Sequence, residues 1–315
     1  SKEYEPLRID STAEHVRAYI KVQDGCNQFC TYCIIPYTRG RVRSRSMSDV
    51  KDEVIRLAQK GYQEVVLTGI HLSSYGVDFK DSDHNLLSLI QSIHQVDGIT
   101  RIRLGSLEPR IITEEFVQTL SGLWKVCPHF HLSLQSGCQE TLERMNRRYT
   151  ADEYREKCQI LRKYYENPAL TTDVIVGFPQ ESLEEFRESY EFVKEIQFYE
   201  THIFKYSRRK GTKADKMEGQ IPEQEKTRRS EQMIALGQER AFQYENSFLG
   251  GKLDILLEEE IQIDGKSYLT GHSREYIKAA VPAEGGWKIN DCVCMIPERF
   301  LKDRLLTGTV TKFSL

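Results

Sequence analysis

The chain has 315 residues, of which 39% are apolar, so it is long enough for one large domain and a smaller one. A mean hydropathy of −0.53 argues against an integral membrane protein, and no run approaches the ~18–20 apolar residues of a membrane-spanning helix. The 44 basic and 47 acidic residues give a net charge of −3, which argues against a polyanionic partner only if the charges are evenly spread. The N-terminal residues do not resemble a secretory signal, so we expect a reducing cytoplasm.

The region from about residue 17 to residue 206 alternates short apolar runs with longer amphipathic runs. This alternation is typical of repeated βα units around a parallel sheet. Six such units with right-handed crossovers predict a partial or complete α/β barrel, although a doubly wound open sheet has the same one-dimensional pattern. We predict strands at residues 18–22, 64–68, 101–104, 129–134, 172–176 and 201–206.

Polar residues mark the start of several predicted helices. Ser48 is expected to cap a helix that ends at Gly61. Two further helices begin with a capping-box pattern, in which a hydroxyl residue is followed three positions later by glutamate. These pairs are Thr150 with Glu153 and Ser182 with Glu185.

The pattern changes after residue 216. A long polar helix is predicted to begin at Pro222 and to end before Gly250 and Gly251, and we interpret it as a linker helix. Five short runs separated by turn residues follow it and predict a small β-barrel of OB-like size. These runs are residues 253–261, 268–273, 276–282, 292–297 and 306–315.

Three of the eight cysteines, Cys26, Cys30 and Cys33, lie within eight residues directly after the first predicted strand. Three thiolates on one loop can hold three irons of a [4Fe-4S] cluster and leave the fourth iron open to a small molecule. The alternatives are a zinc site that lacks its fourth ligand and three unrelated buried thiols. Zinc sites usually close with a second C-x2-C pair or with histidine, so the spacing favours the iron–sulfur cluster.

The segment from Gly25 to Cys33 resembles the radical S-adenosylmethionine (SAM) superfamily, whose C-x3-C-x-aromatic-C loop follows the first barrel strand. Tyr32 stands at the aromatic position. The resemblance implies that Cys26, Cys30 and Cys33 are the catalytic cluster ligands and that the open iron chelates SAM. It also implies that electron transfer from the cluster splits SAM to a 5′-deoxyadenosyl radical.

Further motifs narrow the resemblance to the methylthiotransferases, which place a methylthio group on tRNA or on a ribosomal protein. The segments Thr68–His71 and Ser106–Pro109 are similar to the branch that acts on N6-threonylcarbamoyladenosine beside the tRNA anticodon. The isopentenyladenosine branch and the ribosomal-protein branch remain alternatives. The resemblance is also carried by Cys33-Ile34-Ile35-Pro36, Leu134-Gln135-Ser136-Gly137, Asp173 to Pro179, and Tyr206-Ser207 with Arg209, Gly211 and Thr212.

All these motifs fall at the carboxyl end of a predicted strand or in the loop after it. Such ends converge on one mouth in an α/β barrel, and we therefore prefer a barrel to an open sheet. Each polar residue taken alone is equally well explained as a turn residue or a strand-end cap. The resemblance implies cofactor contacts by Tyr32, Thr68, Gly69, Ser106, Glu108, Gln135, Ile175, Val176, Gly177 and Phe178.

Positive charge is concentrated in two segments, residues 39–45 and 205–216. Such clusters can neutralise phosphates around a pocket, and the alternative is a solvated basic loop. His71 is expected either to contact the substrate or to be solvated, and His129 and His131 are expected in the core or the barrel lining. Substrate contacts are predicted for His71, Arg43, Arg45, Arg147 and Arg209.

The five other cysteines show no second three-ligand spacing, so we expect buried or inert thiols. The methylthiotransferase family carries, ahead of its radical domain, a separate domain whose three cysteines hold an auxiliary [4Fe-4S] cluster. By this resemblance the chain begins after that domain and lacks the auxiliary cluster.

Together these features predict an α/β protein with a partial (βα)6 TIM-like barrel of radical SAM type, followed by a small all-β barrel that resembles the tRNA-holding TRAM domain. We predict a linker at 1–14, the radical SAM core at 15–242 and the TRAM domain at 243–315, with a tRNA patch around Arg299, Lys302 and Arg304. The resemblance implies a cytoplasmic monomer, not bound to membranes, that adds a methylthio group to C2 of the modified adenine. Its implied partners are the tRNA anticodon stem-loop and a one-electron donor such as flavodoxin or ferredoxin. An alternative of another class is a non-catalytic RNA-binding module with a structural metal.

Overall fold

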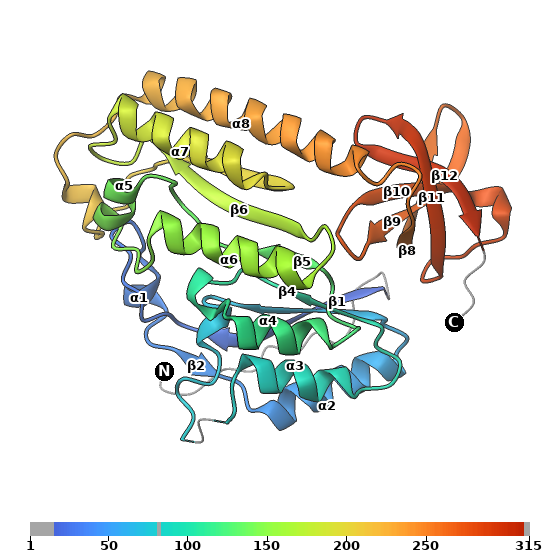
Figure 1. The fold of residues 1–315 in the computed structure, drawn as a ribbon. Coiled ribbons are helices and arrows are strands. Elements are labelled where there is room, and N and C mark those ends of the chain that lie inside the picture. The colour runs from blue at the N-terminus through green and yellow to red at the C-terminus, as the bar shows by residue number, and fades with distance from the viewer. Residues whose placement is uncertain (1–15, 81–82, 312–315) are drawn as a thin grey trace.

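The computed structural model describes residues 16–80 and 83–311. They form a curved sheet with helices on its outer face and a small closed β-barrel at one end (Figure 1). The predicted linker at residues 1–14 lies outside the described residues. In the part of the chain that is described, no helix has both the length and the apolar character needed to cross a membrane.

Six parallel strands form the curved sheet, and each lies where the sequence predicts a strand. The pairing order runs from β1 through β3 to β4 and, in a second set, from β5 through β6 to β7. Isolated parallel bridges from Ile102 to Val126 and from Leu107 to Leu132, on either side of β5, join the two sets. Because β7 pairs only with β6, the barrel stays open, as a partial barrel is expected to be. The strands are β1 (Arg17–Asp24), β3 (Glu64–Gly69), β4 (Arg101–Leu104), β5 (His129–His131), β6 (Ala169–Val176) and β7 (Glu200–Lys205).

Two details of the sheet differ from the prediction. The short strand β2 (Arg43–Ser44) pairs antiparallel with the end of β1 and is too brief to give a sequence pattern. The predicted strand at 129–134 was too long, because β5 ends at His131. Beyond that point, the backbone of Ser133 donates to Leu107 and that of Gln135 donates to Asp173, so the chain changes partners instead of continuing one ladder.

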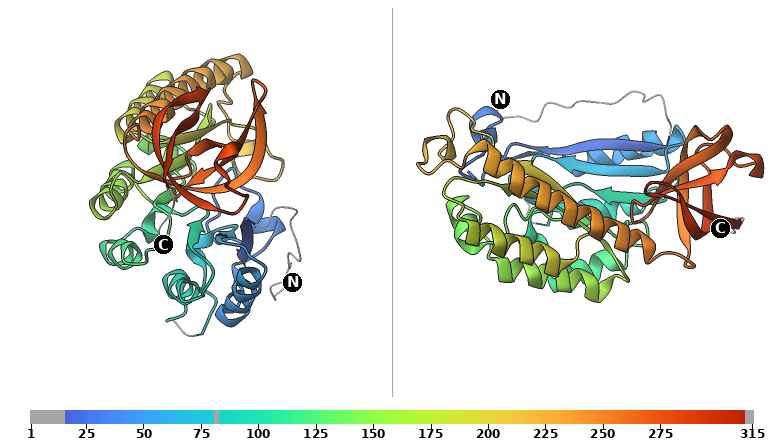
Figure 2. Two further views of the ribbon diagram at one scale, coloured as in Figure 1. Left: turned by 90° about the vertical axis from the view of Figure 1, so that its right-hand side faces the viewer. Right: turned by 90° about the horizontal axis from the view of Figure 1, so that it is seen from above.

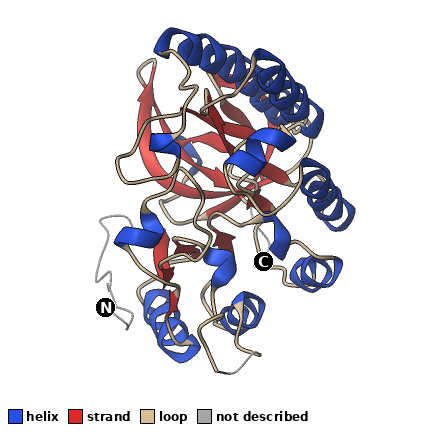
Figure 3. Ribbon diagram, turned by 90° about the vertical axis from the view of Figure 1, so that its left-hand side faces the viewer, coloured by secondary structure: helices blue, strands red, loops and turns tan. Residues whose placement is uncertain are grey.

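Helices cover the convex face of the sheet (Figure 3). The capping boxes at Thr150 and Ser182 are confirmed, with both reciprocal hydrogen bonds present. The prediction for Ser48 was wrong, because Ser46 has the extended backbone of a cap and accepts from the Asp49 N–H at 3.2 Å. The helices are α1 (Ile35–Thr38), α2 (Met47–Gln59), α3 (Leu86–His94), α4 (Glu114–Ser121), α5 (Gln139–Arg144), α6 (Ala151–Tyr164), α7 (Leu183–Ile196) and α8 (Glu223–Asn246).

The core lies between the sheet and these helices. Alternate residues of a strand face opposite sides, and Ile20 on β1 and Leu67 on β3 are buried against the helical layer. The opposite side of the sheet is not filled by a core, because Tyr19 on β1 is 52% exposed and Phe204 on β7 is 53% exposed. The concave face therefore remains accessible to a ligand.

Residues 253–311 form the predicted small β-barrel, closed in the order β10-β12-β11-β8-β9. Its core continues into the end of α8 through Ala241, which is buried with Ile255 and Val293. The predicted domain boundary between residues 242 and 243 falls inside α8 and stays a prediction. The strands are β8 (Leu253–Ile263), β9 (Lys266–Ser273), β10 (Lys278–Pro282), β11 (Cys292–Lys302) and β12 (Leu305–Thr311).

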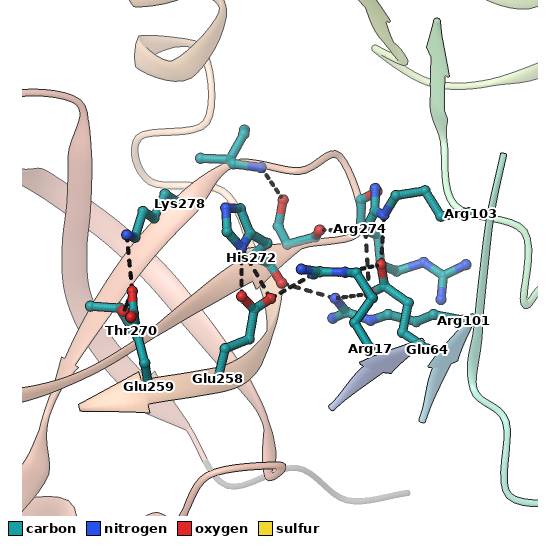
Figure 4. A network of polar contacts seen from close by, with 12 residues as sticks. Arg17, Glu64, Arg101, Arg103, Glu258, Glu259, Thr270, His272, Arg274 and Lys278 are labelled. Carbon is teal, nitrogen blue, oxygen red and sulfur yellow. Dashed lines mark hydrogen bonds and ion pairs between the residues drawn. The ribbon is translucent and has the colours of Figure 1, made fainter. Parts of the chain in front are cut away.

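The small barrel packs against the amino ends of the parallel strands, at the opposite end of the molecule from their carboxyl ends (Figures 1 and 2). A buried ionic network joins the two parts (Figure 4). Glu64, fully buried at the start of β3, accepts from Arg17 and Arg103 at 2.7 Å each. Arg17 also reaches Glu258 of β8 at 2.6 Å, and Arg103 donates to the Arg274 carbonyl at 2.9 Å. The contacts fix the orientation of the barrel on the sheet.

Candidate functional site

The loops after the parallel strands meet at the carboxyl end of the half-barrel, and the cysteine loop after β1 lies among them. Gly25 begins this loop with φ of +72°, a conformation that favours glycine. A Cβ atom there would lie 2.0 Å from the Arg41 carbonyl oxygen, so only glycine permits this approach. The Cys26 N–H donates to the Gly40 carbonyl at 3.1 Å, which joins the cysteine loop to the basic segment that follows it.

The middle of the cysteine loop is held by two other segments. The Thr31 N–H donates to the Met145 carbonyl at 3.0 Å, and the Thr31 hydroxyl donates to the Arg144 carbonyl at 2.8 Å. The Ala214 N–H donates to the Thr31 carbonyl at 2.8 Å. The loop is therefore held by hydrogen bonds to segments on both sides of it.

The thiols lie in a partly buried position beside a cation. Cys26 and Cys30 are each 9% exposed, and burial raises the pKa of Cys26 and of Cys33. Nη1 of Arg147 donates to Sγ of Cys30 at 3.2 Å. The structure brings Arg147 to the cysteine loop, and its predicted contact with a substrate stays a prediction.

Gln23 connects the cysteine loop to the loop after β3, and no motif pointed to this residue. Its fully buried amide donates to the Gly25 carbonyl at 2.7 Å and accepts from the His71 N–H at 2.7 Å. A Cβ atom at Gly69 would lie 2.7 Å from Oε1 of Gln23, so this contact needs glycine. Thr68, next to it, donates to the Ile20 carbonyl at 3.3 Å.

His71 is brought to the same mouth and is not simply solvated. Its Nδ1 lies 2.6 Å from the Ser74 hydroxyl, while its Nε2 is buried without a hydrogen-bond partner within the described residues. Burial, together with the charges of Arg147 and Arg110, lowers the pKa of His71 to about 4. The imidazole is therefore neutral at neutral pH and keeps one ring nitrogen free for a ligand.

Ser106 and Glu108 follow β4 and differ in how accessible their side chains are to a ligand. The Ser106 hydroxyl is exposed and lies 2.8 Å from that of Ser133. The Glu108 carboxylate is buried and accepts from Arg110 Nε at 2.7 Å. Arg110 also donates to Gln28 of the cysteine loop at 3.2 Å, so Glu108 positions that loop indirectly.

The residues after β5 and β6 form the next part of the mouth. Gln135, half-buried with φ of +72°, accepts at its carbonyl from the Ile175 N–H at 2.8 Å. Ile175 is half-buried, whereas Val176 and Gly177 are buried. A Cβ atom at Gly177 would lie 2.4 Å from the Lys226 side chain. Among these three residues, Ile175 thus has the side chain that is accessible to a cofactor.

Phe178, predicted to contact the cofactor, is fully buried. Its ring packs edge-on against Tyr32, with centroids 6.3 Å apart, and against Tyr206 at 5.3 Å. Tyr32, the aromatic residue between Cys30 and Cys33, therefore packs against Phe178, and this contact supports the cysteine loop.

The predicted basic substrate contacts separate into two groups. Arg45 is 2% exposed and pairs with Glu53 at 2.6 Å and Asp49 at 2.8 Å, so its charge is compensated within the protein. Its contact with a substrate stays a prediction. Arg43 is half-buried and pairs with Asp24 at 3.3 Å, whereas Arg209 is exposed near Cys33.

A family model described as the radical SAM superfamily matches residues 20–193, more than half of the chain. The chain belongs to the radical SAM superfamily. Membership implies a [4Fe-4S] cluster and SAM, in agreement with the prediction from the cysteine spacing. The matched range runs from β1 into α7 and includes all three cysteines of the loop.

Two relatives illustrate the place of the chain within the radical SAM superfamily. It is 40% identical over 277 residues to threonylcarbamoyladenosine tRNA methylthiotransferase MtaB of Bacillus subtilis, covering 87% of this chain and 61% of that protein. It is 37% identical over 259 residues to the tRNA-2-methylthio-N(6)-dimethylallyladenosine synthase of Acetivibrio thermocellus, covering 82% of this chain and 54% of that protein. The chain thus spans less than two thirds of the length of these relatives.

Solved structures of radical SAM enzymes share the fold. The methyltransferase TsrM of Kitasatospora setae aligns with a TM-score of 0.53 and 19% identity, over 63% of this chain and 38% of that one. The coproporphyrinogen III oxidase HemN of Escherichia coli aligns with a TM-score of 0.51 and 14% identity, over 73% of this chain and 53% of that one. At these identities the likeness shows the fold alone, and it confirms the partial barrel.

The cysteine loop fits an iron–sulfur cluster better than a single ion. Thiolates that bind one zinc at ~2.3 Å have their sulfur atoms about 4 Å apart. Among the described residues, the sulfurs of Cys26, Cys30 and Cys33 do not all gather within 4.8 Å of one another. At least one pair of these sulfurs is therefore farther apart than two thiolates on one ion, and a cube with an iron at each thiolate accommodates the greater separation.

The other cysteines do not form a second cluster site. All eight cysteines lie in the described residues and are free thiols, and Cys127, Cys138 and Cys158 are buried at 1% exposure or less. Cys292 and Cys294 lie on β11 of the small barrel.

Iron content follows from this arrangement. We expect about four irons per chain after anaerobic reconstitution, because one group of three cysteines is available for one cluster. Iron and sulfide analysis of the desalted protein checks the number. A value near eight irons would contradict a single cluster site.

Proposed function

We propose that this chain carries the SAM-cleaving and tRNA-binding parts of a methylthiotransferase that acts on C2 of N6-threonylcarbamoyladenosine in tRNA. The identity of 40% to a relative named for this reaction supports the substrate. The bound cluster supplies the electron that cleaves SAM. We place the protein in the cytoplasm as a monomer that receives its electron from a flavodoxin or ferredoxin.

Within this proposal, Cys26, Cys30 and Cys33 hold the cluster, and the chain's own residues orient SAM. Ser106 and Gln135 supply polar groups at the mouth, and Ile175 packs against the adenine. Thr68 and Gly69 offer backbone groups at the end of β3. His71 meets the substrate with its unpartnered Nε2.

The observation that carries the proposal is a set of unpaired cations on the two segments that contact the cysteine loop. The basic segment after the loop is attached at Gly40, and the segment from 205 to 216 is attached at Ala214. Lys205 pairs with Glu223 and Arg208 pairs with Asp215. Within residues 16–80 and 83–311, the other exposed cations of the two segments have no carboxylate at ion-pair distance, so their charge is available to tRNA phosphates. These residues are Arg39, Arg41, Arg209, Lys210, Lys213 and Lys216.

The small barrel is proposed as a second tRNA contact of the TRAM type. The predicted patch is smaller than expected, because Arg304 lies within 2.9 Å of Glu245 and pairs with Glu200 at 3.1 Å. Arg299 and Lys302 lie on β11 and remain candidates.

Nucleoside analysis of tRNA tests the substrate. Deletion of the gene in its own host is expected to remove 2-methylthio-N6-threonylcarbamoyladenosine and leave its precursor, as measured by liquid chromatography and mass spectrometry. Restoring the complete gene should recover the nucleoside, and a copy with Cys30→Ser should not, because that copy cannot hold the cluster. Unchanged methylthio nucleosides in the deletion strain would contradict a tRNA substrate.

The same measurement separates a second candidate. The identity of 37% to a dimethylallyladenosine-specific synthase favours an isopentenyladenosine substrate as the alternative. Loss of 2-methylthio-N6-isopentenyladenosine, with the threonylcarbamoyl nucleoside retained, would select that alternative.

A further inference from the structure

Three side chains with metal-binding atoms face one another on neighbouring strands of the half-barrel. His131 ends β5, Asp173 lies in β6 and His202 lies in β7. The register pairs His131 with Thr171 and Asp173 with His202. Their ligand atoms all lie within 4.8 Å of one another, closer than the sulfurs of the cysteine loop. We call these three residues the His–Asp–His group.

The group has the geometry of a preformed ion site. Nε2 of His131 lies 3.3 Å from Oδ2 of Asp173, and the two imidazole rings are stacked with centroids 5.7 Å apart. The other ring nitrogen of His131, Nδ1, lies 2.8 Å from the Thr171 hydroxyl. A partner on the second nitrogen fixes the ring orientation of a metal-bound histidine, and Thr171 provides it here.

The charge and the exposure of the group also suit a cation. The side chains of His131 and Asp173 are 17% and 29% exposed, and His202 is exposed, so an ion can reach them from the concave face. Among the described residues, no arginine or lysine lies within ion-pair distance of Asp173. Its negative charge therefore remains available to a metal ion.

We propose that His131, Asp173 and His202 bind one divalent transition-metal ion on the concave face of the half-barrel. Two imidazoles and one carboxylate are the ligands preferred by Zn²⁺, Fe²⁺, Co²⁺ or Ni²⁺, whereas Mg²⁺ and Ca²⁺ prefer oxygen ligands throughout. Three protein ligands on one side leave the remaining coordination positions open to water or to a ligand in the half-barrel.

The position separates this ion from the cysteine loop. Ile175 lies two residues beyond Asp173 on the same face of β6. This spacing places Ile175 about 7 Å nearer the mouth than Asp173. The ion would therefore lie deeper in the half-barrel than Ile175, on the side away from the mouth. The inference does not rest on the proposed function, because it depends only on the side chains of three strands.

Cobalt binding to the cluster-loaded protein tests the proposal, since the three loop thiolates are then occupied by iron. Equilibrium dialysis against Co²⁺ with metal analysis is expected to give one ion per chain, at a dissociation constant in the micromolar range or below. His202→Gln and Asp173→Asn should each weaken binding at least about 100-fold, because each removes a direct ligand and even outer-sphere changes cost 10–100-fold. His94→Gln on α3 is the matched control, because it removes a histidine outside the His–Asp–His group. It should leave the affinity for Co²⁺ unchanged.

The triple variant Cys26→Ser, Cys30→Ser, Cys33→Ser gives an independent measurement without the cluster. Circular dichroism establishes that it is folded, and it should retain one Co²⁺ per chain with the absorption bands of nitrogen and oxygen ligands. If it does not fold, the cluster-loaded protein still decides the question. Equal Co²⁺ binding by the parent protein and His202→Gln would overturn the proposal, and so would no stoichiometric binding by the parent protein.

Discussion

Replacing Cys30 by serine is expected to abolish reductive cleavage of SAM, with 5′-deoxyadenosine production falling at least about 100-fold. Cys30 supplies one of three thiolates from a loop that is fixed on both sides, and serine is a poor ligand for iron at neutral pH. The reduced protein is incubated with SAM and dithionite, and 5′-deoxyadenosine is measured by mass spectrometry. The visible absorption of the cluster should fall in parallel.

Cys294→Ser is the matched control for this experiment. Cys294 is a free thiol on β11 of the small barrel, far along the chain from the cysteine loop. The control should retain the iron content and the 5′-deoxyadenosine yield of the parent protein. If Cys30→Ser kept the parent's yield, the assignment of the cysteine loop as the cluster site would be wrong, and an RNA-binding module with a structural metal would become the better interpretation.

Replacing Glu64 by glutamine is expected to lower the free energy of unfolding by about 3–5 kcal/mol, the range for breaking a buried ion pair from one side. Glu64 is fully buried, and Arg17 and Arg103 both donate to its Oε1 at 2.7 Å. Arg101 lies 3.7 Å from its other oxygen. The neutral amide would leave these buried guanidinium groups without most of their compensating charge. Urea denaturation followed by circular dichroism measures the loss.

Glu218→Gln is the control, because Glu218 is exposed and has no ion pair within the described residues. It should change the unfolding free energy by less than about 0.5 kcal/mol. A loss below about 1 kcal/mol for Glu64→Gln would mean that the junction relaxes around the missing charge.

The effect of Glu64 on stability also has a defined pH dependence. Burial alone would raise the pKa of Glu64, but the charges of Arg103 and Arg17 outweigh it and hold the pKa well below its usual range. The unfolded chain then binds more protons than the folded chain below pH ~4.3, the ordinary pKa of glutamate. The stabilisation is fully present above that pH and is lost as the pH falls toward the folded-state pKa. The difference between the parent protein and Glu64→Gln should therefore be constant from pH 8 to 5 and shrink only in stronger acid.

The prediction of the half-barrel succeeded because each strand carries its own apolar run, and the capping boxes at Thr150 and Ser182 are complete within four residues. The environment of Arg45 is not predictable from such local patterns. Arginines at alternate positions from 39 to 43 precede it, which suggested a phosphate contact, but Glu53 and Asp49 of α2 pair with its guanidinium. Phe178 is a second example, since its motif predicted a cofactor contact and the structure buries its ring edge-on against Tyr32.

The sequence by itself determined the cysteine spacing, the order of the βα units and the small β-barrel, because these depend on residues close together in the chain. The tertiary structure decided which polar residues share a site. Gln23 joins Gly25 to His71, Arg147 approaches Cys30, and His131, Asp173 and His202 meet across three strands. These partners lie up to about 120 residues apart, and only the pairing of strands and the packing of loops bring them within bonding distance.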